Sequence, residues 1–379
     1  MTKFTNFFKV IACFTCLTIQ MNMVSAQWPP IGIVGNGTVN DPWQITTITQ
    51  LTNLATYVNA GNGSLIAGKY YKLMNDIDYN SSGMINNAKG WSPIGNNEIT
   101  GAIFQGNFDG NGKKVYNIRI NRDTTSYIGL FGYVSSAHIH NLGVRVYQEI
   151  IGNKYVGGLI GRADNSTIDS CYAIGNITGN YAVGGLVGVS NSSTIHDSYT
   201  ICDVRGYILY GGDNSTVGGL VGMNDGIIRT SYASGNVTAK GKEAGGFAGT
   251  NNNTIIDCYA VGNVIGHDSY MGGFAGANKD DGNLSYCYAT GDIKALGGDY
   301  IGGLVGVNTK GPLINCIAAN NSVSGGVSNV NRVVGVNKGT LSNNYAFAGM
   351  AITPNGGDPG TNETMTTLKS FNFYNTGNN

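Results

Sequence analysis

The chain contains few of the residues that usually bind a metal or act as a catalytic base. It has four histidines, His138, His140, His196 and His267, and none of them is followed by glutamate. A zinc peptidase needs two histidines on one helical face with a glutamate base beside them, so the HExxH motif is absent. His138 and His140 would share one face of a strand, but a pair without a third ligand indicates ordinary surface residues.

The acidic residues are scattered along the chain instead of clustering at one place. Polysaccharide lyases and hydrolases gather their carboxylates at a single site, sometimes with calcium. Asp280 and Asp281 are adjacent, so on a strand they would point in opposite directions, and they predict a solvated loop. Asp169, Asp197 and Asp257 recur at nearby positions of a repeat, which favours a turn. We therefore expect no catalytic, cofactor-binding or metal-binding residues.

A glycine-rich phrase, "VGGLVG", begins at Val183 and recurs almost unchanged at Val217 and as "IGGLVG" at Ile301. Phosphate-binding glycine motifs occur once, between a strand and a helix. Here the phrase recurs, no helical pattern follows it, and no Lys-Ser/Thr pair closes it. The phrase therefore predicts a structural turn, whose paired glycines permit either a positive φ or a close approach of stacked backbones.

The phrase marks a repeat. Six full copies start at Val156, Val183, Val217, Ala244, Met271 and Ile301, at intervals of 27, 34, 27, 27 and 30 residues, with worn copies at Ile128 and Arg332. Apolar runs are short and stop at Gly or Asn, which is typical of short strands joined by turns. One such unit cannot bury its apolar side alone and must stack on its neighbours. We expect each unit to form one coil of a parallel β-helix, with three strands of four to six residues.

When such coils stack about 4.8 Å apart, equivalent residues of successive coils form a column. Two neighbouring columns can be recognised in the sequence. One contains Cys171, Ser198, Ser231, Cys258, Cys287, Cys316 and Asn344; the next contains Tyr172, Tyr199, Tyr232, Tyr259, Tyr288, Ile317 and Tyr345. Cysteine alternating with serine predicts small, buried, free thiols. Adjacent columns face opposite sides, and the sequence alone leaves the direction open. Outward tyrosines would form an aromatic stripe able to bind a glycan or a partner, whereas inward tyrosines would be core, which we favour.

The segments outside the repeats have different patterns. Residues 1–26 carry Lys3 and Lys9, an apolar run and a small-residue site, which predicts a signal peptide cleaved after Ala26 and a secreted or cell-surface protein. Residues 27–126 are expected to form an N-terminal cap and the first irregular coils, and residues 127–349 the repeats. Residues 350–379 would be a C-terminal cap or linker. No later apolar run reaches the length of a transmembrane helix.

The N-terminal cap contains one amphipathic pattern. Leu51, Leu54, Ala55 and Val58 follow helical spacing, and Gly61 would end the helix. Such a helix would cover the open edge of the first coil. The sequence "FDGNG" at 108–112 lacks the acidic spacing of a calcium-binding EF-hand and predicts a turn between strands.

The composition narrows the classes of function. The chain has 379 residues, 59 of them glycine, a formal net charge of zero, and only 12% charged residues. This balance provides no electrostatic attraction to nucleic acid or to an anionic membrane. Hydrophobic residues make up 41%, too many for a disordered chain.

The repeated "GGLVG" with partners such as "CYATG" resembles the GLUG motif. GLUG repeats are found in bacterial surface proteins and beside the catalytic part of IgA-specific metallo-endopeptidases. The resemblance covers about residues 35–349 and implies a right-handed parallel β-helix at a bacterial cell surface, commonly adhesive. It implies no particular ligand.

Together these patterns predict an exported, non-catalytic, all-β protein. It would act in adhesion or scaffolding through a long solenoid face and variable loops, such as residues 207–216. The expected partner is a glycan or protein of a host or matrix, and no cofactor is expected. The alternative is a β-helical enzyme, a lyase or hydrolase acting on polysaccharides.

Overall fold

The computed structural model describes residues 28–29, 32–82, 88–207, 215–267, 270–354 and 361–365. The predicted signal peptide and the aromatic residues of 366–379 lie outside these ranges, as does most of the predicted contact loop at 207–216.

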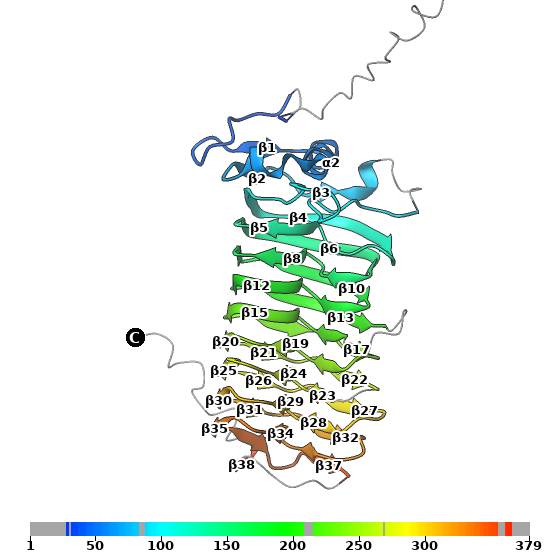
Figure 1. Cartoon of the computed structure of the whole chain (residues 1–379), viewed down its shortest axis with the longest axis vertical. Helices are drawn as coiled ribbons and strands as arrows, with labels where there is room; N and C mark the ends of the chain where they lie inside the picture. Colours follow the sequence, from blue (N-terminus) through cyan, green and yellow to red (C-terminus); the bar gives the residue numbers. More distant parts are fainter. Residues whose placement is uncertain are drawn as a thin grey trace, which may run out of the picture.

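The repeats stack as coils of a parallel β-solenoid, which confirms the predicted fold class (Figure 1). One coil consists of β18 (Glu243–Gly245), β19 (Ala248–Asn251), β20 (Thr254–Ile256), β21 (Tyr259–Ala260) and β22 (Val264–Gly266). The next coil begins at β23 (Tyr270–Gly272), which pairs with β18 in parallel. Five segments of two to four residues replace the three longer strands that we expected, because the backbone bends more often than the apolar runs indicated.

The first residues of each glycine phrase form a separate seven-stranded sheet. Its strands are β7 (Lys154–Val156), β11 (Tyr181–Gly184), β14 (Thr216–Gly218), β18, β23, β28 (Tyr300–Gly302) and β33 (Val330–Asn331). Val183 pairs with both Val156 and Val217, so the repeat alignment is confirmed by the register. The last, degenerate copy begins at Val330, which pairs with Ile301, so its start lies two residues before the expected Arg332.

The remaining strands belong to one 31-stranded sheet that winds along the whole solenoid. The N-terminal coils contribute β1 (Trp43–Ile45), β2 (Tyr70–Leu73), β3 (Ile77–Asp78), β4 (Asn107–Arg122), β5 (Phe131–Ser135), β6 (His138–Gly152), β8 (Ile160–Asp164) and β9 (Thr167–Asp169). The middle coils contribute β10 (Tyr172–Gly179), β12 (Val187–His196), β13 (Tyr199–Gly206), β15 (Val221–Arg229), β16 (Tyr232–Ser234) and β17 (Val237–Ala239).

The C-terminal coils complete this sheet. They contribute β24 (Ala275–Asn278), β25 (Asn283–Ser285), β26 (Tyr288–Ala289), β27 (Ile293–Ala295), β29 (Val305–Asn308), β30 (Pro312–Ile314), β31 (Ile317–Ala318), β32 (Ser322–Ser324), β34 (Val334–Asn337), β35 (Thr340–Ser342), β36 (Tyr345–Phe347), β37 (Ala351–Thr353) and β38 (Thr361–Glu363). β36 pairs in parallel with β38, so the described chain continues the same winding at this end.

The predicted amphipathic helix is confirmed as α2 (Ile48–Tyr57), followed by the short turns η1 (Val58–Asn62) and η2 (Gly63–Ile66). Thr47 and Gln50 form a capping box at its start. Leu51 and Leu54 are fully buried and join the core of the solenoid. The helix lies beside β1 and β2 at the N-terminal end of the rod, where it closes the core (Figure 1).

The "FDGNG" turn is confirmed as a corner inside β4. Asn111 and Gly112 have φ of 53° and 69°, and the Asp109 carboxylate accepts a hydrogen bond from the Asn111 N–H at 2.7 Å. The strand continues beyond the corner and pairs in parallel with β6. The corner therefore turns the coil without forming a hairpin.

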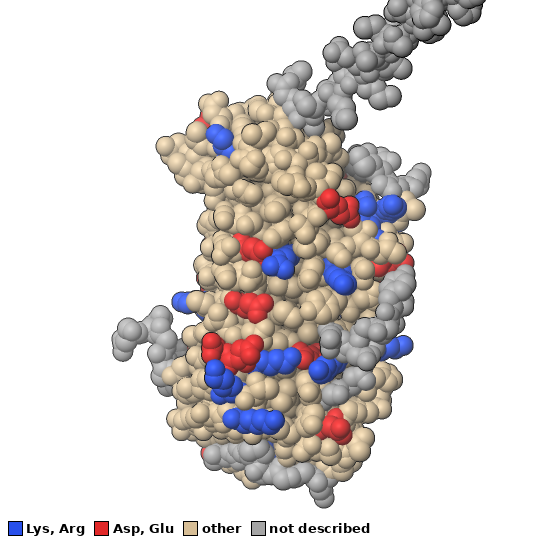
Figure 2. Space-filling model, in the orientation of Figure 1, with Lys and Arg blue, Asp and Glu red and all other residues tan. Residues whose placement is uncertain are grey.

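The outer surface carries few charges, and the two signs are interspersed on the face shown in Figure 2. The helices that the structure describes are all too short or too polar to cross a lipid bilayer.

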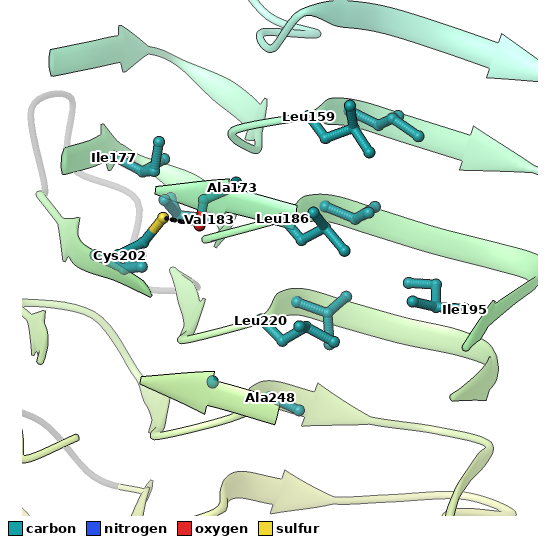
Figure 3. Packing of buried hydrophobic residues seen from close by; sticks show 14 of the residues in the cluster. Leu159, Ala173, Ile177, Val183, Leu186, Ile195, Cys202, Leu220 and Ala248 are labelled. Atoms are coloured by element: carbon teal, nitrogen blue, oxygen red, sulfur yellow. Dashed lines mark hydrogen bonds between the residues drawn. The ribbon is translucent and has the colours of Figure 1, made fainter. Parts of the chain in front are cut away.

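The interior is filled by like side chains stacked on successive coils. Leu159, Leu186 and Leu220 lie one above another (Figure 3), and all three are fully buried. Further along, the rings of Phe247 and Phe274 are parallel with centroids 4.7 Å apart. The Leu-Val and Phe-Ala pairs of the repeat thus supply the core.

Asparagines form a second row, in which Asn224, Asn251, Asn278 and Asn308 are buried and Asn337 is exposed at the C-terminal end. The side-chain amide of each donates to the side-chain oxygen of the next at 2.7 to 2.9 Å. This asparagine ladder satisfies polar groups that would otherwise be buried without partners.

Close packing of backbones explains the repeated glycines. A Cβ on Gly185 would lie 2.2 Å from the carbonyl oxygen of Gly219 on the next coil, and one on Gly184 would lie 2.1 Å from that of Val187. Neither glycine has a positive φ. Of the two explanations left open by the sequence, close approach is therefore the correct one for these positions.

The long repeat keeps its strands in register. Its extra residues lie between Gly206, the end of β13, and Thr216, the start of β14. Gly206 pairs with Ala239, and Thr216 pairs with Glu243. The insertion is therefore accommodated in one loop, whose residues 208–214 are not among those described.

Candidate binding surface

The cysteine column points into the core. Cys171, Cys258, Cys287 and Cys316 are buried free thiols, as predicted, and so is Cys202 outside the column. The Cys171 thiol donates to the carbonyl of Asp169 at 3.1 Å, and on the next coil the Ser198 hydroxyl donates to that of His196 at 2.8 Å. Cysteine and serine can replace each other at this position because both donate a hydrogen bond to the carbonyl oxygen of the residue two positions earlier.

The tyrosine column therefore points outward, and the favoured expectation of a tyrosine core is wrong. Tyr172, Tyr199, Tyr232, Tyr259, Tyr288 and Tyr345 are all half-buried on the outer surface, whereas the neighbouring cysteine positions are buried. We call these six residues the tyrosine ladder. Because side chains alternate along a strand, the cysteine and tyrosine columns had to lie on opposite faces, but alternation does not determine which face lies inside.

A left-handed residue before the cysteine column decides the direction. The corner residues are Ser170, Asp197, Thr230, Asp257, Tyr286, Asn315 and Asn343, and their φ values run from 49° to 54°. The first side chain after such a tight corner has room inside the coil only for a small group such as Cys, Ser or Asn. The corner also confirms Asp197 and Asp257 as turn residues; Asp169 lies one position earlier, at the end of β9.

The rings of the ladder stack face to face. From Tyr172 to Tyr288, neighbouring centroids are 5.1, 4.9, 4.9 and 4.8 Å apart, and the planes deviate from parallel by only 4° to 11°. Ile317 interrupts the stack before Tyr345. Because each inner ring covers the faces of its neighbours, a ligand meets a row of ring edges and phenol hydroxyls.

Three phenols of this row, those of Tyr172, Tyr232 and Tyr259, remain protonated at neutral pH. Partial burial raises the pKa of Tyr172, Tyr232 and Tyr259 above the usual value of a tyrosine, and neighbouring phenols contribute in the same direction. Protonated phenols donate and accept hydrogen bonds. These three residues therefore add uncharged hydrogen-bonding groups to the ladder.

Two groups of titratable residues were missed by the sequence analysis. Glu243 is buried, and its carboxylate lies 2.5 Å from the Lys279 amine and accepts a hydrogen bond from Thr250. On an earlier coil, the Asp164 carboxylate accepts hydrogen bonds from Arg162 at 2.8 Å and Tyr133 at 2.6 Å.

The expectation that no coil gains such a cluster was therefore incomplete. Lys279 reaches Glu243 from the coil that follows it, so the pair is formed by stacking and not by adjacency in the sequence. One signal was available: Glu243 is the single charged residue in a column whose other members are Tyr155, Ala182, Thr216, Tyr270, Tyr300 and Asn329. A buried carboxylate of this kind needs its cation, because an unpaired buried charge is costly.

The other residues considered in the sequence have ordinary positions. Asp281 lies in an exposed turn and forms an ion pair with Lys310 at 3.3 Å, where both side chains are largely exposed. His138 and His140 share one face of β6, as predicted, and their rings stack with centroids 4.4 Å apart.

Comparison with known proteins confirms the repeat. The family model described as "The GLUG motif" matches residues 152–178, 213–238 and 267–294. The chain thus carries GLUG motif repeats, and each match covers a glycine phrase together with the aromatic block that follows it.

Two curated proteins are similar over part of the chain. Halomucin of Haloquadratum walsbyi is 31% identical over 146 residues, which are 38% of this chain and 2% of halomucin. A "Putative Gly-rich membrane protein" of Evansella cellulosilytica is 34% identical over 100 residues, 26% of this chain and 10% of that protein. The similarity therefore spans only a small part of either relative.

A solved structure has the same fold. It is described as a "putative immunoglobulin A1 protease" from Bacteroides ovatus, with 23% sequence identity and a TM-score of 0.52. The alignment covers 69% of this chain and 79% of that one. At this identity the likeness extends to the β-solenoid alone.

Proposed function

We propose that this chain is an exported, non-catalytic surface protein that mediates attachment or scaffolding through the outer face of its solenoid. The observation that carries the proposal is the tyrosine ladder, an outward row of stacked rings that repeats once per coil. Tyrosine is enriched at binding surfaces because its rigid ring buries apolar area while its hydroxyl forms hydrogen bonds.

The regular spacing favours an extended ligand over a small one. A small molecule would meet one or two hydroxyls on an open surface, whereas a polymer lying along the rod would meet several. Many weak contacts on one rigid support add up through effective concentration. We therefore propose a glycan or an extended protein segment of a host or matrix as the ligand.

The location at the cell exterior has separate support. The basic and apolar pattern of residues 1–26 is typical of a secretory signal. Halomucin and the Gly-rich membrane protein carry names that refer to mucin and to membrane, although the similar segment is a small part of each. An exported location also suits the scarcity of charge on the surface, which offers little attraction to nucleic acid.

A binding assay with matched variants tests the proposal. Wild-type protein and a triple variant, Tyr199→Phe with Tyr232→Phe and Tyr259→Phe, are applied to immobilised mucin, a glycan array and matrix proteins. The triple variant keeps the stacked rings but loses three hydroxyls, so we expect at least tenfold weaker binding. The control is Tyr147→Phe, which alters a tyrosine that is 63% exposed and lies outside the ladder.

Two results would contradict the proposal. Equal binding by the wild type and the triple variant would remove the ladder as the contact surface. Release of reducing or unsaturated sugars from a polysaccharide by the wild type would indicate the alternative, a β-helical enzyme, and Glu243 would then be the first residue to replace.

A further inference from the structure

A column of charged and imidazole side chains lies on the outer face of the N-terminal coils. Strand register aligns Lys72, Asp109, His140, Asp169, His196 and Arg229 on six successive coils. From Lys72 to His196, acidic residues alternate with basic or imidazole residues along it. Three of the four histidines of the chain, His138, His140 and His196, lie on this face, on β6 and β12.

The two ends of the column differ in how their carboxylates are neutralised. Asp109 pairs with the Lys72 amine at 3.3 Å and has the His140 ring 3.7 Å away. Asp169 and Asp197 instead both face the ring of His196, with Nδ1 at 3.3 Å from one carboxylate and 2.9 Å from the other. Within the described part of the chain, neither of these two carboxylates forms an ion pair with Lys or Arg.

Two other polar or charged side chains, those of Ser170 and Arg229, lie near Asp169 and His196. The Ser170 hydroxyl donates to Asp169 at 2.8 Å. Arg229, next after His196 in the column, lies close enough to Asp257 to lower the pKa of that carboxyl, although burial raises it more. Two carboxylates thus converge on one imidazole without a permanent cation between them.

The donor atoms have the spacing of a metal site. One ligand atom from each of Asp169, His196 and Asp197 lies within 4.8 Å of the others. The side chains are 27%, 30% and 53% exposed, so an ion from solvent has access. Imidazole nitrogen combined with carboxylate oxygen suits zinc and its neighbours among the divalent transition metals.

We propose that Asp169, His196 and Asp197 bind a divalent transition-metal ion, with Zn²⁺ as the representative. The ion occupies the space between the two carboxylates and the ring, in place of the present contacts between them, and water completes its coordination. Asp169 ends β9 and His196 ends β12 on the next coil. The ion therefore links two coils, and binding stabilises their stacking.

Isothermal titration with ZnCl₂ tests the site on the protein without its signal peptide. We expect saturable binding of one ion to this site, with MgCl₂ giving none. His196→Ala removes the central ligand and Asp197→Asn removes one charged ligand, so each weakens binding at least tenfold. Asparagine tolerates the left-handed backbone of residue 197, so this variant keeps the corner.

The control variant is His267→Ala, which removes the one histidine that does not lie on this face; its side chain is exposed. We expect it to bind Zn²⁺ as the wild type does. Circular dichroism verifies the fold of each variant. Absence of saturable binding by the wild type, or unchanged binding by a folded His196→Ala variant, overturns the proposal. Neither outcome bears on attachment through the tyrosine ladder, since the two sites use different residues.

Discussion

The rings of Tyr232 and Tyr259 lie 4.9 Å apart and only 4° from parallel, although they belong to different coils. Their Cα atoms are register partners in the ladder of β16 and β21. The separation matches the spacing of neighbouring strands in a sheet, so each ring is held where the backbone places it. The tyrosine ladder is thus produced by the same hydrogen bonds that build the rod.

Stacking within the tyrosine ladder should contribute to stability. Tyr232→Ala removes ring contacts with both neighbours, each worth about 0.5–1.5 kcal/mol, so we expect a loss of about 2 kcal/mol in the free energy of unfolding. Tyr232→Phe keeps both contacts and should change it by less than about 0.5 kcal/mol. Urea denaturation measures both, with Tyr147→Ala as a control. Equal stability of the Ala and Phe variants would show that the stack contributes nothing.

The second glycine of the phrase should tolerate no side chain. A Cβ on Gly246 would lie 2.2 Å from the carbonyl oxygen of Gly273 on the next coil and 3.1 Å from the Cβ of Ala260. Because the atom that a Cβ would meet is backbone of a stacked coil, we expect Gly246→Ala to destabilise the protein by about 3 kcal/mol or more. At Gly68 the space is open but φ is 68°, so Gly68→Ala should cost only about 1–2 kcal/mol. Thermal unfolding compares the two, and similar losses would refute the close-approach explanation.

Replacing an asparagine inside the asparagine ladder should destabilise the protein more than replacing the one at its end. Asn251→Ala removes one of the two acceptors of the Asn224 amide, which still donates to the Gly226 carbonyl, and leaves the side-chain oxygen of Asn278 without its donor. Unpaired buried polar groups cost about 1–3 kcal/mol each, so we expect a loss of 2 kcal/mol or more, as an order of magnitude. Asn337 is exposed at the end of the ladder, and Asn337→Ala should cost less than half as much. The denaturant midpoints of the two variants measure these losses of stability. Equal losses would contradict a cooperative ladder.

The buried thiols should make stability depend on alkaline pH. Burial raises the pKa of Cys171 and Cys202 from 9.0 to about 12. Below pH 9 the folded and the unfolded chain both keep the thiols protonated, so the stability gained by burying protonated thiols is fully present. Between pH 9 and about 12 the unfolded chain loses these protons while the folded chain keeps them, so stability falls as pH rises.

Unfolding measured from pH 8 to 11 tests this dependence. The variant Cys171→Ser, which places at this position the residue found on the next coil, should show a shallower decline than the wild type. At pH 8 a thiol reagent should leave the native protein unlabelled and modify it after denaturation. Rapid labelling of the native protein would show that the column is open to solvent.

Much of the fold could be predicted from the residues alone. The recurrence of the phrase at Val156, Val183 and Val217 established the coil, its register and the parallel sheet, because stacked coils must place equivalent residues side by side. Leu51 and Leu54 predicted the helix at the N-terminal end in the same local way. The buried free thiols followed from the exchange of Cys with Ser.

What the sequence determined by itself was therefore the periodic part: the stacked coils and the two columns on opposite faces. Only the tertiary structure decided that the tyrosines face outward, because left-handed corners such as Asp257 leave inner space for small groups alone. Tertiary structure also brought Lys279 to Glu243 and Asp169 to His196. These contacts join residues of different coils that break the repeat, so the period alone does not reveal which charged groups will meet.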